Sequence, residues 1–369
     1  MNETFQNLEW LVIFIRTICI TTIAVDFLQI YIIYRYSRSD IGSYKYLLLI
    51  FSLFGIFYSS INLIMHPGMF CWGDAFGLYP INYELLQNWP ASLPILHTLF
   101  CADYSISILL VLIHFLYRYF CICKKDQMKW LTFPRSLVWV FLFLIFVWVF
   151  CTPIYIAFQP EQADREYVRS FFMDNYGVDP YKIYFLIGRY FEDTPNGRVA
   201  RWGIILTIVN CIVLNMIILV MIFYIFWKMS NALKMLDSTM SKRSKRLQVQ
   251  FFRALTLQTF IPLITAFIPI GVFYACPFFR INLGIYSNAV VVLLSFYSLL
   301  DGIVILVVVT DYRRAVVEMF FKKFSLRFNT SNRVDSTNHS DALRNRYEHG
   351  SSARIHEISG SLPAAISQR

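Results

Sequence analysis

The sequence predicts an all-α membrane protein built as a bundle of seven transmembrane helices. Three observations support this fold class: seven long apolar stretches, a low content of charged residues, and an uneven distribution of basic residues among the loops. The chain has 369 residues, of which 57% are hydrophobic and 15% are charged. A soluble domain would carry about 25% charged residues.

Each apolar stretch is long enough to cross a bilayer. A helix needs about 20 residues for this, and the backbone has no water to bond inside the hydrocarbon, so these stretches must be helical. An odd number of spans puts the two chain ends on opposite sides of the membrane. The predicted spans are Leu11–Tyr34, Tyr46–Met65, Leu93–Tyr117, Ser136–Phe158, Gly203–Trp227, Phe252–Pro277 and Tyr286–Val309.

The basic residues give the orientation. The first, third and fifth connections and the segment after the last span, together with Arg253 at the inner start of the sixth span, carry 25 Lys and Arg, whereas the opposite side carries 7. Because cytoplasmic loops are enriched in Lys and Arg, we expect the N-terminus outside and the C-terminus in the cytoplasm. The net charge of +10 is then a topology signal, and we expect no nucleic-acid partner.

This orientation divides the chain into four parts: an extracellular N-terminus (1–10), the helix bundle (11–309), an amphipathic interfacial helix (310–328) and a disordered cytoplasmic tail (329–369). Apolar residues at helical spacing and several basic residues suit segment 310–328 to the inner membrane interface, where it would contact lipids. The tail has too few apolar residues to build a core. Its serines and threonines are either sites for a kinase, with arrestin binding to follow, or simply solvated.

Ionisable residues inside spans are costly, so they mark candidate functional positions. Asp103 lies fifteen residues before Arg118 in the third span, which places it about 22 Å farther out. We expect a ligand site there with Tyr104 and Ser107, in which Asp103 meets either a cationic ligand or an internal donor such as Arg16. Asp301 is expected in a polar network. Arg118 either engages a cytoplasmic partner or only extends to the membrane interface.

Prolines and cysteines add two structural predictions. Pro262 and Pro269 interrupt the sixth span and make it a candidate hinge, although static packing would explain them equally well. Cys71 and Cys101 both fall on the outer side and could pair. The cysteines show no metal-ligand spacing, and we predict neither a metal nor a cofactor.

The sequence carries no enzyme signature. The zinc-protease helix, the phosphate-binding loop and the nucleophile turn are all missing from it. A ligand-gated channel or a transporter remains the alternative to a receptor, although we find no internal repeat of the transporter kind.

Several segments, in order along the chain, resemble the Str class of nematode seven-transmembrane serpentine chemoreceptors, with the related Srj class sharing several features. They are Ile41–Leu47 with Phe57–Ser59, His114–Phe120, Leu257–Pro262, Pro269–Phe273, Pro277–Phe279 and Asp311–Arg314. The resemblance implies a G-protein-coupled, olfactory-type receptor for small environmental molecules in the plasma membrane of sensory-neuron cilia.

The same resemblance implies coupling to a heterotrimeric G protein at the inner ends of the third and sixth spans. The residues that we expect to take part are Tyr117, Arg118, Tyr119, Lys242, Arg243, Lys245 and Arg246. One departure from the family pattern is Tyr297–Gly302, which keeps Asp301 but lacks both prolines of the seventh span. A proline hinge in that span is therefore in doubt.

Overall fold

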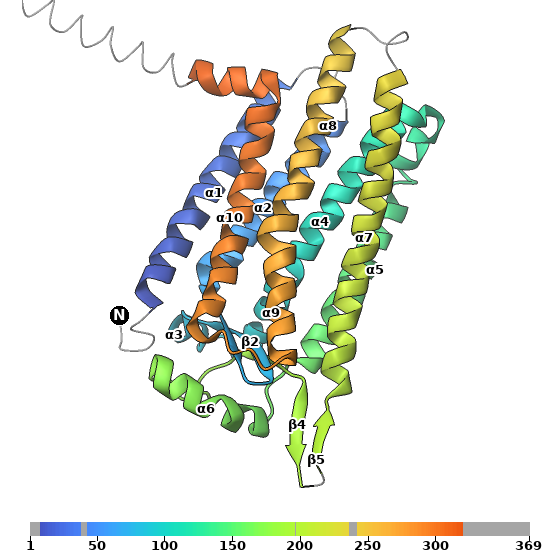
Figure 1. Ribbon diagram of the computed structural model, residues 1–369. Coiled ribbons are helices and arrows are strands. Elements are labelled where there is room, and N and C mark those ends of the chain that lie inside the picture. The colour runs from blue at the N-terminus through green and yellow to red at the C-terminus, as the bar shows by residue number, and fades with distance from the viewer. Residues whose placement is uncertain (1–7, 38–42, 196, 236–241, 320–369) are drawn as a thin grey trace, which may run out of the picture. The chain divides into compact units, whose positions relative to one another are not determined.

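Seven helical segments of the computed structural model are long and apolar enough to cross a membrane, which confirms the expected fold class (Figure 1). The structure describes residues 8–37, 43–195, 197–235 and 242–319. Contacts divide the chain into two units, Met1–Arg313 and Arg314–Arg369. The first unit contains all seven spans.

The spans overlap the predicted stretches, and several extend beyond them. α7, at 34 residues, rises about 51 Å at 1.5 Å per residue and so exceeds the roughly 30 Å hydrocarbon core. The spans are α1 (Glu9–Tyr36), α2 (Tyr44–Met65), α4 (Leu93–Cys123), α5 (Leu137–Ala157), α7 (Trp202–Met235), α8 (Lys242–Pro262) continued by α9 (Ile268–Phe278), and α10 (Asn288–Val308).

The sixth span is interrupted where its prolines lie. A π-helical turn, Leu263–Phe267, separates α8 from α9. Pro262 ends α8, and Pro269 falls in the first turn of α9, where a missing N–H costs little. π-Helical turns concentrate at functional positions in helices. The structure thus places an irregular turn between the two predicted hinge prolines.

The loops at the outer end form a small folded layer that the sequence analysis did not predict (Figure 1). β1 (Pro67–Trp72) and β2 (Ala75–Pro80) form a hairpin, and β3 (Leu186–Arg189) pairs with β2. β4 (Phe191–Thr194) and β5 (Gly197–Ala200) form a second hairpin. We call β1–β3 together with α6 (Gln162–Tyr176) the outer lid.

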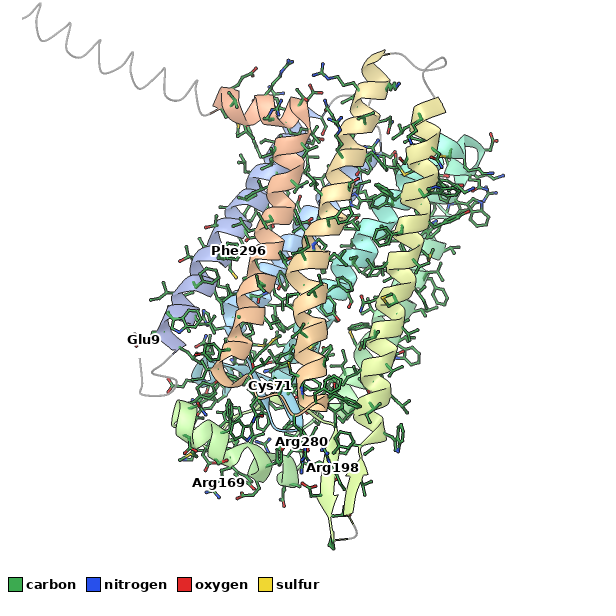
Figure 2. The ribbon with its side chains drawn as sticks, in the orientation of Figure 1. Glu9, Cys71, Arg169, Arg198, Arg280 and Phe296 are labelled. Carbon is green, nitrogen blue, oxygen red and sulfur yellow. The ribbon has the colours of Figure 1, made fainter. Side chains whose placement is uncertain are left out.

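Ion pairs hold the outer lid to its neighbouring loops. Asp74, in the turn between β1 and β2, accepts hydrogen bonds from Arg198 at 2.6 Å and from Arg280 at 3.0 Å. Figure 2 shows both arginines at this end of the molecule. Asp164, in the first turn of α6, accepts a hydrogen bond from Arg201 at 2.6 Å. Between α6 and the sheet lies an aromatic cluster that includes Phe70, Phe171, Phe172, Tyr79 and Phe185.

Short elements complete the described residues: α3 (Tyr83–Leu86) and 3₁₀ helices at Pro90–Ser92, Lys125–Leu131 and Gly284–Ser287. Residues 310–319, in the segment predicted to form an interfacial helix, are helical. The rest of that helix, the tail 329–369 and residues 1–7 of the N-terminus lie outside the described residues.

Candidate functional site

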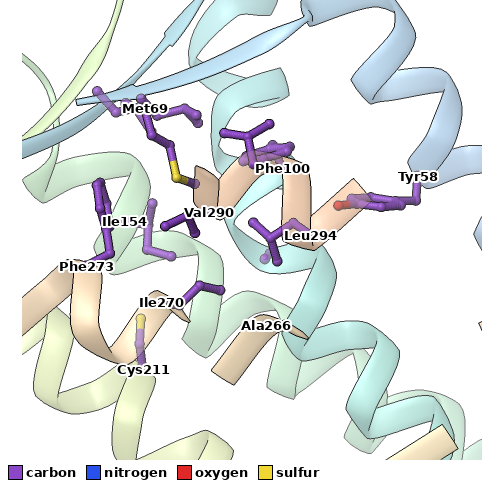
Figure 3. Packing of buried hydrophobic residues seen from close by; sticks show 14 of the residues in the cluster. Tyr58, Met69, Phe100, Ile154, Cys211, Ala266, Ile270, Phe273, Val290 and Leu294 are labelled. Atoms are coloured by element: carbon purple, nitrogen blue, oxygen red, sulfur yellow. The ribbon is translucent and has the colours of Figure 1, made fainter. Parts of the chain in front are cut away.

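A cavity lies directly beneath the outer lid, among α4, α9 and α10. Its volume is about 40 Å³, whereas one water needs about 10–15 Å³. Most of its surface is apolar. Figure 3 shows five of its lining side chains within the core, with Met69 reaching from β1 toward α10. These five are Met69, Phe100, Ile270, Phe273 and Leu294.

The lid side of the cavity is fixed by contacts with the spans. The backbone N–H of Met69 donates to the Asn288 side chain of α10 at 2.9 Å, and the Ile187 N–H donates to the Phe158 carbonyl at 2.9 Å. A Cβ atom at Gly77 would overlap the Phe70 ring and the backbone of β3. Glycine at this position therefore allows close packing of the sheet above the cavity.

Of the three predicted ligand residues, Tyr104 alone lines this cavity. Its ring packs edge-on against Phe267 of the π-helical turn, with 5.7 Å between ring centroids. Ser107 donates to the Asp103 carbonyl at 3.0 Å and lines a different, smaller cavity. Neighbouring positions on a helix point about 100° apart, and so Asp103 does not share the direction of Tyr104.

Asp103 is buried, and Arg16, the internal donor suggested for it, bonds elsewhere. It is 2% exposed, and its Oδ1 atom has no hydrogen-bond partner among the described residues. Arg16 instead donates to His66 Nε2 at 3.1 Å. Burial, followed by the charge of Arg16, lowers the pKa of His66 to about 4, so this histidine accepts the hydrogen bond as a neutral ring.

The smaller cavity holds a group of polar side chains in the middle of the bundle. It has a volume of about 20 Å³ and is lined by Asp26, Asp301, Ser107 and two tyrosines, Tyr58 and Tyr297. Asp301 thus lies beside other polar side chains, and its part in a polar network stays a prediction.

Two glycines make room for the Asp26 carboxylate at this cavity. A Cβ atom at Gly55 would lie 2.5 Å from Asp26 Oδ2, and one at Gly302 would lie 3.1 Å from Oδ1. Gly302 of α10 therefore has a steric role beside Asp26.

The sequence left open whether Cys71 and Cys101 pair. Both thiols are free. Cys71 lies in β1 and donates to the Ile281 carbonyl at 3.4 Å. Burial raises the pKa of the Cys71 thiol to about 11, which keeps it protonated and able to donate. Ion pairs such as Asp74–Arg198, rather than a disulfide, connect the outer loops.

At the inner end, Arg118 joins α4 to α8. Its Nη1 atom donates to Gln248 Oε1 at 2.9 Å, and its guanidinium carbon lies 3.6 Å from the Tyr44 ring centroid and 4.0 Å from that of Phe251. Such cation–π contacts stabilise a desolvated guanidinium. Arg118 is only 4% exposed, so a cytoplasmic partner can reach it only if α8 moves away.

The other predicted coupling residues are placed differently. Tyr117 stacks at a tilt against Tyr44, and Tyr119 contacts Phe120. Lys245 and Arg246 line a separate groove between α8 and α10. The side chains of Lys242 and Arg243 lie outside the described residues.

Sequence reasoning missed Gln248, Phe251 and Tyr44 as partners of Arg118. Tyr44 belongs to a segment that carried the family resemblance, which was the one signal pointing to it. Gln248 and Phe251 are three residues apart and therefore share a helix face, but that spacing does not identify the helix that they contact.

The comparisons with known proteins agree with this architecture. The family model described as "Serpentine type 7TM GPCR chemoreceptor Str" matches residues 12–317. "G-protein coupled receptor str-33" of Caenorhabditis elegans is 27% identical over 83% of this chain and 89% of its own length. "Serpentine receptor class r-10" of the same species is 29% identical over 75% of this chain and 81% of its own length.

A third relative, "Serpentine receptor class J-38" of C. elegans, is 24% identical over 84% of this chain and 93% of its own length. The family is one of receptors rather than enzymes. With seven apolar helices and a family match that runs from the first span to just past the last, the chain belongs to the Str family of serpentine seven-transmembrane G-protein-coupled chemoreceptors.

Proposed function

We propose that the receptor binds a small, largely apolar molecule in the cavity beneath the outer lid and activates a heterotrimeric G protein at its inner end. The observation that carries the proposal is the apolar cavity bounded by Tyr104 and Ile270. Ligand sites are concave and mostly apolar, with a few fixed polar groups. Because the cavity has a volume of only about 40 Å³, a ligand larger than a few waters must displace its walls.

The contacts offer a route from this cavity to the inner end. Tyr104 lines the cavity and packs against Phe267, which belongs to the π-helical turn between α8 and α9. A ligand that displaces Tyr104 therefore acts on the irregular turn of the sixth span. Movement of α8 about that turn would break the Arg118–Gln248 hydrogen bond and expose Arg118 to the G protein.

The ligand site can be tested by filling the cavity. Ile270 lines it and is 7% exposed, whereas Val272, in the same helix, is 52% exposed and faces outward. A chemical panel applied to cells with a nucleotide-exchange readout would first identify agonists. Ile270→Phe should then raise the agonist concentration needed by tenfold or more, and Val272→Phe should leave it unchanged. An unaltered dose–response curve for a well-expressed Ile270→Phe receptor would show that the agonist does not bind in this cavity.

The coupling site needs a separate test, because a receptor can bind without signalling. Arg118→Ala should abolish agonist-stimulated nucleotide exchange while agonist binding persists. Arg135→Ala, at an exposed arginine near the start of α5, is the matched control. Normal exchange in the Arg118→Ala receptor would contradict the assignment.

The family membership also supports proposals about where the receptor lies in the cell and which proteins act on its tail. We place the receptor in the plasma membrane of a sensory-neuron cilium, with kinase and arrestin acting on its tail. Imaging of a fluorescently tagged receptor in such neurons would test the first proposal, and phosphopeptide mapping of residues 329–369 after agonist exposure would test the second.

A further inference from the structure

A basic groove lies between α8 and α10 at the inner end of the bundle, apart from the Arg118 site. Its volume is about 490 Å³, and four of its lining side chains are cationic. These are Lys245, Arg246, Arg253 and Arg313. No acidic side chain lines it within the described part of the chain.

The groove faces away from Arg118. Gln248 and Phe251 form the face of α8 that contacts Arg118. Arg246, Gln250 and Arg253 recur at intervals of four and three residues and so form another face. Each residue of a helix rotates the side-chain direction by about 100°, so Gln250, two residues after Gln248, points nearly opposite to it. The cationic face of α8 is therefore turned away from the interior of the bundle.

The groove also lies at the depth of the membrane interface. Arg253 is one residue into the apolar stretch Phe252–Pro277, and the opposite wall begins at Val308, the last residue of α10. Arg246, Arg253 and Arg313 are all exposed. An exposed arginine at this depth is stabilised by the phosphates of the inner leaflet, and Val249 and Val308 supply apolar surface beside it.

The two walls are fixed relative to each other. Gln250 Nε2 donates to Thr310 Oγ1 at 2.7 Å, and the Thr310 backbone N–H donates to Gln250 Oε1 at 3.2 Å. This paired hydrogen bond joins α8 to the segment after α10 and lines the groove itself. The cationic side chains are thus arranged around a preorganised polar floor, which lowers the entropic cost of binding a ligand.

We propose that this groove binds the headgroup of an anionic membrane phospholipid that carries several phosphates, such as a phosphorylated phosphatidylinositol. Arginine forks bind phosphate oxygens bidentately, and a headgroup with several phosphates can engage cations on both walls at once. A lipid fits better than a soluble anion because the groove combines cations with apolar surface at the end of two spans. The proposal does not depend on the ligand cavity or on G-protein coupling.

Full-length receptor in nanodiscs provides the test. Discs would contain phosphatidylcholine with 5% phosphatidylinositol bisphosphate, or with enough phosphatidylserine to match the total charge, and bound lipid would be measured by native mass spectrometry. We expect wild-type receptor to retain the bisphosphate lipid at least tenfold over phosphatidylserine. Arg253→Gln combined with Arg313→Gln should reduce its retention about 10- to 30-fold, because each basic residue near the surface contributes a several-fold effect.

A matched variant separates the groove from general surface charge. Lys129→Gln with Arg135→Gln removes two exposed positive charges from the same side of the membrane, outside the groove, and should change retention less than threefold. An equal loss in both double variants would show a non-specific charge effect and overturn the proposal. If Arg253→Gln with Arg313→Gln unfolds in phosphatidylcholine discs, Arg246→Gln alone, at an exposed position, replaces it.

Two further outcomes would also overturn the proposal. If soluble inositol trisphosphate displaces the lipid fully at equal concentration, the site recognises a free phosphate compound rather than a membrane lipid. If the groove variant loses G-protein nucleotide exchange in discs that contain only phosphatidylcholine, the groove is a contact for the G protein. Retention that persists against the soluble headgroup supports the lipid.

Discussion

The Arg118–Gln248 hydrogen bond, at 2.9 Å, joins α4 to α8 at the end of the bundle where we propose that a G protein binds. Hydrogen bonds to charged groups contribute about 1.5–3 kcal/mol, enough to change a two-state equilibrium more than tenfold. Gln248→Leu keeps the size of the side chain but removes the acceptor. We expect it to raise agonist-independent nucleotide exchange several-fold. The control is Gln127→Leu, which makes the same change at an exposed position. Equal agonist-independent exchange in the two variants would contradict the idea that Gln248 holds the inner end of the bundle closed.

Gly55 of α2 and Gly302 of α10 leave room for the buried Asp26 carboxylate of α1. Both lie against the Asp26 carboxylate, and a Cβ atom at Gly55 would come within 2.5 Å of it. Gly55→Ala should therefore destabilise the receptor by about 1–3 kcal/mol through overpacking, visible as a lower unfolding temperature in detergent. Gly271→Ala, whose added Cβ would meet no atom within 4 Å, is the control. An unchanged unfolding temperature for Gly55→Ala would mean that Asp26 moves freely.

The helices could be predicted from the sequence, whereas the outer lid could not. Each span is a continuous apolar stretch whose hydrogen bonds are local, so its length and composition identify it. The strands have only four to six residues, and β2 pairs with β3 across more than a hundred positions, for example Gly77 with Ile187. The pairing register of strands that lie so far apart in the sequence depends on tertiary contacts. Helix geometry alone turns the adjacent residues Asp103 and Tyr104 about 100° apart, but which of them lines a cavity depends on the packing of the other spans.

Asp74 connects the outer lid to two other loops, and its removal should loosen the roof of the cavity. Its side chain is 4% exposed and binds Arg198 and Arg280. These arginines are 34% and 56% exposed, so solvent weakens both pairs and we expect a moderate effect. Asp74→Ala should speed agonist dissociation several-fold and increase hydrogen exchange in β1 and β2.

The matched control for Asp74 is Asp193→Ala. Asp193 is 68% exposed and lies 3.9 Å from Arg189, a weaker surface pair on the same side of the molecule. Faster exchange in β1 and β2 for both variants would indicate a general charge effect rather than a local connection through Asp74.

The ion pairs on the predicted outer side help to interpret the charge distribution of the whole chain. Seven basic residues lie on the predicted outer side, yet several are compensated there: Arg198 and Arg280 by Asp74, Arg201 by Asp164, and Arg169 by Glu166. By contrast, Arg246, Arg253 and Arg313 of the inner groove form no ion pair with any residue that the structure describes. The net positive side is therefore more clearly the C-terminal one than the count of 25 against 7 alone indicates.

We accordingly expect the N-terminus and the outer lid to face the outside of the cell and residues 329–369 to face the cytoplasm. The two ends would carry different epitope tags, each probed with antibody on intact and on permeabilised cells. The N-terminal tag should be labelled on intact cells, and the C-terminal tag only after permeabilisation. The reverse pattern would place the lid cavity in the cytoplasm and the groove of Arg253 and Arg313 outside. An extracellular ligand and a cytoplasmic G protein would then be impossible together, and the channel alternative would have to be reconsidered.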